Sequence, residues 1–202
     1  MDSKEIILKN TFNLLLIKGF DAVSITDIQQ ITGLSRGLLY HYFKNKEDLF
    51  IQVTDKYFVK IFDFNIGKVK GLSVFEFVDF ICNRFKNINR IISDIVEENG
   101  SMSSNVSMLN YHFLFYQVMQ RDSSFRHNYR VAIEKEQAGW ENALKNSIRS
   151  KALRQDIDIL TSAKQLFILT DGIWFQAIFS KHGESIIQDL KSTLSHYIRL
   201  LE

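Results

Sequence analysis

The sequence predicts an all-α fold with a small N-terminal head and a larger helical body. The 202 residues include no proline, which would break the interior of a helix. Apolar residues recur at steps of three and four along most of the chain, as they do on one face of a helix. The segment from Ser24 to Lys46 has the pattern of two short helices joined by a turn that contains glycine.

Each expected helix carries an apolar stripe that can face a core. The stripe of the first, over about residues 3–18, is Ile7, Leu8, Phe12 and Leu15. The helix that follows Lys46 carries Phe50, Val53, Tyr57 and Ile61, and Gly67 and Gly71 interrupt it. The longest stripe is Val74, Val78, Ile81, Phe85, Ile88, Ile92 and Ile95. Further helices are expected at about residues 108–120, 124–149, 158–181 and 185–201, with a polar loop over residues 99–107.

The segment from Ser24 to Lys46 begins with clear boundaries for a first short helix. Ser24 can cap this helix, and Asp27 three positions later completes a capping-box pattern. Gly33 stands where the chain must leave the helix, and glycine tolerates the left-handed backbone needed there. These residues predict a short helix that ends in a tight turn.

The second short helix combines an inward pair with an outward set of side chains. Ser35 can cap it, and Leu39 and Phe43, four residues apart, can anchor it to the core. Five side chains are left for its outward or lateral faces: Arg36, Leu38, Tyr40, His41 and Tyr42. From residue 34 to residue 46 the basic residues are Arg36, Lys44 and Lys46, and there is no acid, so the local charge of +3 suits a phosphate backbone.

At these residues the chain resembles the tetracycline-repressor-type (TetR) family of transcriptional regulators. The resemblance covers about the first fifty residues. Its marks are Lys18-Gly19-Phe20, Ser24-Ile25-Thr26-Asp27-Ile28, Gly33-Leu34-Ser35, Gly37, Leu39-Tyr40, Tyr42-Phe43 and Lys46-Glu47-Asp48-Leu49. The chain departs from the family pattern at Gln29, where a small residue is common, and at Leu38, where a small or hydroxylated residue is usual.

The resemblance implies a helix-turn-helix DNA-binding domain over residues 1–47 and a helical ligand-binding and dimerisation domain over residues 48–202. It implies a homodimer that binds a palindromic operator in double-stranded DNA, most simply as a repressor that a small, largely apolar molecule releases. The alternative is a helical ligand-binding or protein-interaction module that has lost specific DNA binding. The reason for considering it is Leu38, which departs from the family pattern.

The resemblance and the outward positions together give a set of expected DNA contacts. Arg36 is the expected base-edge contact, because arginine can fork onto guanine. Leu38 could touch a thymine methyl group, and His41 could reach a base or a phosphate. The other members of the set are expected near the phosphate backbone: Thr26, Ser35, Gly37, Tyr40, Tyr42, Lys44 and Lys46. Each tyrosine could instead be a packing residue, and Lys44 could be a solvated loop charge.

The last two expected helices differ from the others. From Leu166 to Phe179 the sequence is apolar on nearly every side, so the helix calls for burial on all sides. The resemblance implies that these helices pair with their copies in a dimer. The expected interface residues are Leu166, Leu169, Ile173, Ala177, Leu190, Leu194 and Tyr197. The other interpretation is that the two helices form the core of this chain alone.

The body is rich in aromatic residues, and the chain has 17 phenylalanines. The resemblance implies a ligand pocket in this part, and aromatic side chains could line it. The candidates are Phe62, Phe80, Phe85, Phe113, Tyr116, Met119, Trp140, Phe167 and Trp174. Any one of them could equally be ordinary core, which is the commoner role of an aromatic residue at helical spacing.

The composition argues against several other classes of protein. A net charge of +2 confines any affinity for nucleic acid to a local surface. Cys82 is the only cysteine, which excludes an internal disulfide and fits a reducing cytoplasm. The apolar run from Leu14 to Ile17 is too short for a signal peptide and is expected inside an amphipathic helix. No apolar stretch approaches membrane-spanning length, so we expect a cytoplasmic protein without a membrane partner.

Catalytic chemistry has little support in the sequence. His112 and His127 are too far apart to bind a metal from one helix face, and a phosphate-binding glycine loop and a nucleophile elbow are both missing. The run Glu134-Lys135-Glu136 is expected to form a solvated face, and Cys82 an inert buried thiol. We therefore expect no enzymatic activity, no metal and no cofactor.

Overall fold

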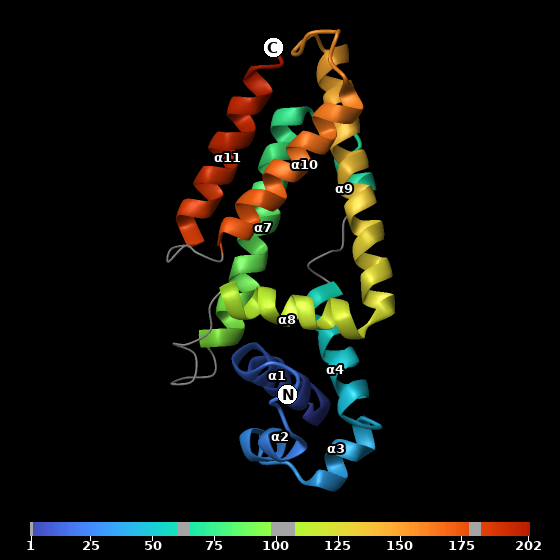
Figure 1. Cartoon of the computed structure of the whole chain (residues 1–202), viewed down its shortest axis with the longest axis vertical. Helices are drawn as coiled ribbons and strands as arrows, with labels where there is room; N and C mark the ends of the chain where they lie inside the picture. Colours follow the sequence, from blue (N-terminus) through green and yellow to red (C-terminus); the bar gives the residue numbers. More distant parts are fainter. Residues whose placement is uncertain (1, 60–64, 98–107, 178–182) are drawn as a thin grey trace. The chain divides into compact units, whose positions relative to one another are not determined.

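The computed structural model describes residues 2–59, 65–97, 108–177 and 183–202, and every regular element in these ranges is helical (Figure 1). In chain order the elements are α1 (Ser3–Lys18), α2 (Ile25–Thr32), α3 (Arg36–Tyr42), α4 (Lys46–Thr54), η1 (Asp55–Val59), α6 (Ile66–Val69), α7 (Val74–Glu97), α8 (Met108–Arg121), α9 (Ser123–Arg149), α10 (Ile159–Gln176) and α11 (Gly183–Arg199). The predicted all-α fold is confirmed. No helix in these ranges is long and apolar enough to cross a membrane.

Over the described residues the helix boundaries lie close to the predicted ones, with one change of geometry. The predicted end of the helix over residues 158–181 lies outside the described residues. The helix that begins at Lys46 is an α-helix only to Thr54, and it continues to Val59 as the π-helical turn η1. Such a turn holds more residues than an α-helical turn. The short helix α6 occupies the glycine-containing segment that the sequence marks as an interruption. The predicted loop over residues 99–107 lies outside the described residues, as does Ile61.

The chain divides into two compact units, which we treat one at a time. Unit 1 comprises Met1–Phe62 and Ile92–Tyr129, and unit 2 comprises Asp63–Ile91 and Arg130–Glu202. Unit 1 therefore contains α4 and α8 as well as the helix-turn-helix. The predicted functional boundary after residue 47 does not coincide with this division and stays a prediction.

The core of unit 1 is built around α1. Its residues from Thr11 to Leu16 are buried in succession, so every face of this stretch is covered. The helices α2, α4 and α8 all contact α1 and supply the cover. The prediction of an amphipathic first helix is therefore wrong for this stretch, because its neighbours leave it no solvent face.

Aromatic side chains fill the rest of the unit 1 core. Phe58 is fully buried and stacks on Tyr111 of α8, with ring centroids 4.9 Å apart. Phe12 of α1 meets the same ring edge-on, at 5.8 Å. Phe115 of α8 and Phe125 of α9 approach it to 6.2 and 5.9 Å. One phenylalanine ring thus joins four helical segments of unit 1.

Unit 2 has its core between α7, α9, α10 and α11. Trp140 of α9 is fully buried and meets Phe77 of α7 edge-on, with ring centroids 4.5 Å apart. The predicted stripe of α7 is confirmed for its first members, all of which are buried: Val74, Val78, Ile81, Phe85 and Ile88. The cysteine of this helix, Cys82, is also buried, and burial raises the pKa of its thiol.

The last two helices pack against each other and into the unit 2 core. Four of the side chains predicted for a dimer interface are buried by the chain itself: Leu166, Ala177, Leu190 and Leu194. A dimer partner cannot bury side chains that this chain already buries, so these four side chains belong to the core. The other three are half-buried: Leu169, Ile173 and Tyr197. The homodimer stays a prediction, and the exposed apolar side chains of α10 that remain for it are Leu160, Ile168 and Phe175.

We predict that Asn13→Leu stabilises the protein. Asn13 is fully buried in α1, and neither of its amide atoms has a hydrogen-bond partner among the described residues. A buried polar group without a partner costs about 1–3 kcal/mol, and leucine has a similar shape. Thermal unfolding followed by circular dichroism should give a higher Tm than that of the unsubstituted protein.

Asn10→Leu is the matched control for this substitution. The Asn10 amide donates a hydrogen bond of 2.9 Å to the Ile6 carbonyl, so its loss should not raise the Tm. A lower Tm for Asn13→Leu would contradict the prediction and indicate that the buried amide has a partner such as a water molecule.

Candidate nucleic-acid interface

The first helix of the helix-turn-helix is held at both ends by the residues that the sequence indicates. The Ser24 hydroxyl accepts from the Asp27 backbone N–H (3.1 Å), and the Asp27 carboxylate accepts from the Ser24 N–H (2.7 Å). The predicted capping box is thus confirmed. At the other end Gly33 has φ 67° and donates its N–H to the Gln29 carbonyl at 2.9 Å. A side chain at this position would be strained by the left-handed backbone.

An ion pair fixes α2 to α1. The Lys18 ammonium lies 2.7 Å from the Asp27 carboxylate. This contact, together with the hydrogen bonds from Ser24, holds the pKa of Asp27 well below its usual range. Asp27 therefore stays ionised at neutral pH, and its ion pair with Lys18 joins α2 to α1 within the head.

The second helix, α3, presents one face to solvent and one to the core. Leu39 and Phe43 are buried, as predicted from their spacing, and the Ser35 hydroxyl caps the helix by accepting from the Leu38 N–H at 3.2 Å. The exposed positions are Arg36, Gly37, Tyr40 and His41, which lie on one side because they are one and four residues apart. The outward face of α3 therefore carries hydrogen-bond donors.

The loop after α3 is ordered by its own side chains. Asn45 caps α4 by accepting from the Asp48 N–H, and the Asp48 carboxylate accepts from the Lys44 N–H, both at 2.8 Å. The hydrogen bond from Lys44 is the main reason that the pKa of Asp48 is lowered. These contacts fix the backbone at Lys44, whose side chain is exposed.

The predicted DNA contacts fall into two groups by exposure. The exposed ones are Thr26, Ser35, Arg36, Gly37, Tyr40, His41 and Lys44, and the half-buried ones are Leu38, Tyr42 and Lys46. The Arg36 guanidinium lies over the Tyr40 ring, 5.6 Å from its centre. The Lys46 ammonium lies 4.2 Å from the centre of the Phe20 ring. In this structure Lys46 thus contacts the side chain that links α1 to α4.

Phe20 is the contact centre that sequence reasoning missed. Its ring packs edge-on against Phe50 of α4, at 4.5 Å, and the Arg121 guanidinium of α8 lies 4.7 Å from its centre. Its backbone N–H donates to the Gln117 side-chain oxygen at 2.9 Å. Arg121 also pairs with Asp21 at 2.6 Å. Because Gln117 is 97 positions away from Phe20, no local sequence pattern predicts the contact between them.

The approach between α8 and the end of α1 is close. A Cβ atom at Gly19 would lie 3.1 Å from the Phe113 ring and 3.2 Å from the Gln117 amide, and the φ of Gly19 is 75°. Glycine fits this position for both reasons. The chain segment that precedes the helix-turn-helix is thus fixed directly on α8.

The comparison with known families agrees with this geometry. Residues 7–53 match the sequence model of the bacterial regulatory proteins of the tetR family. The matched residues run from α1 into α4 and include the whole helix-turn-helix described above. The N-terminal part of the chain, over residues 7–53, therefore belongs to the tetR family.

One curated relative supports this assignment of the N-terminal part of the chain. The chain is 38% identical over 56 residues to YerO of Bacillus subtilis (strain 168), an uncharacterized HTH-type transcriptional regulator. The match covers 28% of this chain and 19% of YerO, so the chain spans about a fifth of the length of that relative.

Solved structures have a similar fold over the whole length of the chain. A TetR transcription regulator from Haloarcula marismortui ATCC 43049 is 18% identical, with a TM-score of 0.66 over 99% of this chain and 98% of that one. A transcriptional regulator of the TerR/AcrR family from Aquifex aeolicus VF5 is 19% identical, with a TM-score of 0.61 over all of both chains. At these identities the similarity establishes the fold.

The candidate pocket residues lie in different environments. Phe62 lies outside the described residues. In unit 1, Phe113 and Tyr116 are exposed, and Met119 is half-buried. The candidates in unit 2 are buried or half-buried: Phe80, Phe85, Trp140, Phe167 and Trp174. Because the candidates belong to two separate units, a shared pocket stays a prediction.

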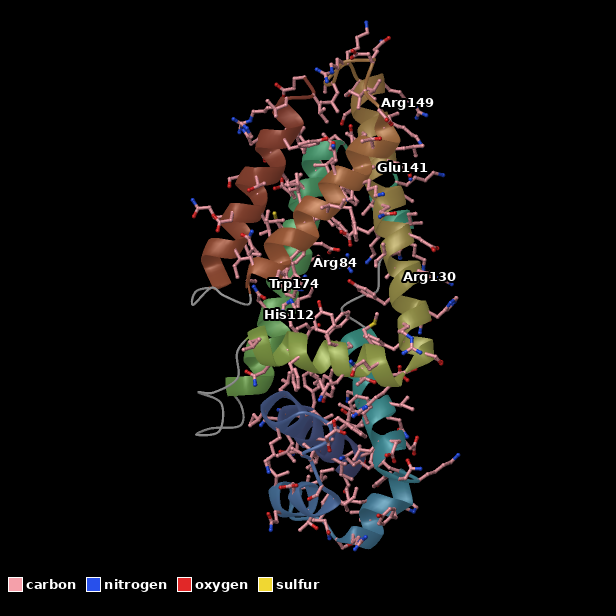
Figure 2. The ribbon with its side chains drawn as sticks, viewed as in Figure 1. Arg84, His112, Arg130, Glu141, Arg149 and Trp174 are labelled. Atoms are coloured by element: carbon pink, nitrogen blue, oxygen red, sulfur yellow. The ribbon has the colours of Figure 1, made fainter. Side chains whose placement is uncertain are left out.

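Unit 2 contains a charged group that the sequence pattern did not reveal. The Glu136 carboxylate of α9 lies 2.6 Å from the Arg84 guanidinium of α7, and both side chains are largely buried. The prediction of a solvated face over residues 134–136 is therefore wrong for Glu136. Burial raises the pKa of Glu136, and the Arg84 charge opposes the rise. Figure 2 labels Arg84 on α7 and Trp174 on α10.

Asp171 of α10 is the third member of this charged group. The residue is exposed, yet the protein atoms around its carboxyl desolvate it and raise its pKa to about 6. The Glu136 charge adds to the rise and the Arg84 charge opposes it. In the described parts of the chain, no three His, Cys, Asp or Glu side chains come together in a way that could hold a metal ion.

We predict that Asp171→Asn stabilises the protein above about pH 6, by about 1 kcal/mol once solvent screening is allowed for, and has little effect near pH 4. The folded-state pKa lies above the ordinary value of 3.8, at about 6. Between these values the folded state binds more protons than the unfolded state, so its stability falls as the pH rises. Asparagine removes this fall.

The measurement is the Tm of both proteins across this pH range. The gap between them should open as the pH rises toward about 6 and then stay constant. Asp189→Asn, at an exposed position of α11, controls for the change in net charge. A gap that is the same at every pH would argue against a desolvated carboxyl at position 171.

Proposed function

We propose that the protein is a DNA-binding transcriptional regulator whose helix α3 lies in the major groove of its target. The observation that carries the proposal is the outward face of α3, with Arg36, Tyr40 and His41 exposed on a helix that Leu39 and Phe43 fix to the core. A helix held in this way can offer donors to base edges. The tetR-family match over residues 7–53 supports the same function.

The division of labour on this surface follows from the chemistry of the side chains. Arg36 is the candidate for reading a base, because its guanidinium can donate two hydrogen bonds to guanine. Lys44 is the candidate for holding a phosphate, since its backbone is fixed by Asp48 and its ammonium is free to turn toward the duplex. Lys46 could reach a phosphate only by leaving the Phe20 ring.

The proposed protein acts as a homodimer on a palindromic operator, most simply as a repressor that a small, largely apolar molecule releases. A twofold dimer matches a palindromic site, and the family supports this arrangement. The contact between α8 and Phe20 gives such an effector a route to the head. A shift of α8 would move Gln117 and Arg121, and through them the segment that precedes the helix-turn-helix.

The proposal is tested first by fluorescence anisotropy on the DNA upstream of the protein's own gene, with an unrelated duplex titrated alongside. We expect selective binding that weakens steeply as the salt concentration rises, because phosphate contacts release counterions. Equal and weak binding to both duplexes would contradict the proposal. It would favour instead a helical ligand-binding or protein-interaction module that has lost specific DNA binding.

We predict that Arg36→Ala and Lys44→Ala have different effects on this binding. Arg36→Ala should lose about 1–3 kcal/mol on the preferred duplex and little on the unrelated one, because a base contact specifies the site. Lys44→Ala should weaken binding to both duplexes and reduce the salt dependence by about one counterion. Equal losses on both duplexes for Arg36→Ala would refute its proposed role in reading a base.

We predict that Gln117→Ala weakens operator binding several-fold without changing its salt dependence. The substitution removes the acceptor of the Phe20 N–H, so the segment that joins the head to α8 is held less firmly in the free protein. DNA binding must then order this segment, at a cost of about 1 kcal/mol. Anisotropy titrations at two salt concentrations measure both quantities. Gln120→Ala, at an exposed position of the same helix, is the control. A reduced salt dependence would indicate instead that Gln117 acts through phosphate contacts.

A further inference from the structure

Helix α1 places a further positive charge beside the helix-turn-helix. Lys4 lies in the first turn of α1, and its ammonium is 5.8 Å from the centre of the Phe43 ring. Phe43 is the residue at which α3 ends, and its ring is buried. The contact therefore brings a cation of α1 to the end of the helix that carries the proposed DNA-binding face.

The Lys4 ammonium is not neutralised by an ion pair. Within the described ranges, no carboxylate lies close enough to Lys4 to pair with it. Its neighbour in sequence, Glu5, is bound instead to Lys56 of η1. Lys4 is half-buried, so part of its side chain remains open to solvent. Its charge is thus available to an anion from outside the chain.

Lys4 and Lys44 lie near the same loop, the one that joins α3 to α4. The Asp48 carboxylate accepts from the Lys44 backbone N–H at 2.8 Å and from the Gln52 side chain at 3.1 Å. These two hydrogen bonds are the main causes that lower the pKa of Asp48, and the positive charges of Lys44 and Lys4 lower it further. Two cations from distant parts of the sequence therefore act on one carboxylate of this loop.

The length of α3 places this loop near an edge of a major groove. A helix of seven residues is about 10 Å long at 1.5 Å per residue. The major groove of B-DNA is about 12 Å wide, with a phosphate backbone along each edge. When α3 lies in the groove, its last residues come close to one of these backbones. Lys44 and Lys4 lie at that end of the helix.

The other lysine of this segment is held elsewhere. The Lys46 ammonium lies 4.2 Å from the centre of the Phe20 ring, to which the Arg121 guanidinium of α8 also comes close. Lys44 alone would then remain for the backbone at the end of α3. Lys4 supplies a second cation at this place.

We propose that Lys4 is a further DNA-binding residue, whose ammonium binds a phosphate on the same strand as Lys44. The inference rests on the proposed function and deepens it, because α1 and the loop after α3 then hold one strand together. Every nucleotide presents the same phosphate, so this contact carries no sequence information. It fixes the position of α3 in the groove and strengthens binding to every duplex alike.

The first arm of the test measures the salt dependence of DNA binding by the full-length protein, with fluorescence anisotropy on the preferred and the unrelated duplex. Lys4→Gln should reduce the slope of log K against log salt by about 0.9, the value for one phosphate contact. Both duplexes should lose affinity by the same factor. An unchanged slope overturns the proposal.

Lys9→Gln is the matched control for this arm. It removes the same charge from the same helix, on another side, because five residues turn an α-helix by about 140° beyond a full turn. The salt dependence of this variant should equal that of the unsubstituted protein. A fall in slope as large as that of Lys4→Gln overturns the specific role of Lys4.

The second arm separates the charge of Lys4 from its contact with the Phe43 ring. Lys4→Met keeps an unbranched apolar side chain over the ring and removes the charge, so it should lose as much affinity as Lys4→Gln. Lys4→Arg keeps the charge and should bind DNA like the unsubstituted protein. A Lys4→Met protein that binds as tightly as the unsubstituted one overturns the proposal, since the contact with the ring would then be what matters.

The third arm locates the phosphate on the DNA. An uncharged methylphosphonate replaces one phosphate at a time along each strand of the duplex, and the positions that cost affinity mark the contacts of the unsubstituted protein. For Lys4→Gln one of these costs should vanish, because its partner charge is already gone. That position should lie on the same strand as the one whose cost vanishes for Lys44→Ala. If every cost remains in Lys4→Gln, the proposal fails.

Failure of this proposal can be told apart from failure of the proposed function. Phosphate contacts do not depend on sequence, so the first two arms can be read on the unrelated duplex as well. Selective binding with an unchanged slope in Lys4→Gln leaves the proposed function standing and overturns the role of Lys4. Equal binding to both duplexes with a reduced slope does the reverse. No binding to either duplex overturns both.

Discussion

The burial of α1 on all sides is the constraint on which the organisation of unit 1 depends. A helix without a solvent face needs partners around its whole circumference, and α2, α4 and α8 together supply them. Since α8 follows α1 by about ninety residues, the head is completed by a part of the chain that the sequence assigns to the body. The head and α8 therefore share one hydrophobic core, and the hydrogen bond from Phe20 to Gln117 lies at its edge.

The local features of the candidate site could be predicted because their causes are local. The Ser24 and Asp27 capping box, the Gly33 turn and the inward pair of α3 each depend on residues within four positions of one another. The contact of Phe20 with α8 could not be predicted in this way, because its partner is 97 residues distant and an exposed glutamine on another helix would look the same in the sequence.

The structure changes two predictions about the body for a related reason. A helical pattern shows which side chains need burial, but it does not show whether the same chain or a partner buries them. In the structure, Leu166 and Leu190 are buried in the core of unit 2, so less apolar surface remains for a partner. A charge pattern likewise shows which residues are ionisable, but it cannot show that Glu136 forms an ion pair with Arg84 of another helix. In both cases the deciding neighbour comes from a distant part of the chain.

The π-helical turn η1 after α4 changes the direction in which the following side chains point, in a helix that packs against two different sets of residues. Before it, Leu49, Phe50 and Val53 face the head, and after its start Phe58 faces the aromatic side chains of α8 and α9. A regular helix would tie these two faces together through its fixed rotation per residue. A wide turn releases them from each other, so a residue gained or lost here during evolution could be absorbed without repacking either side.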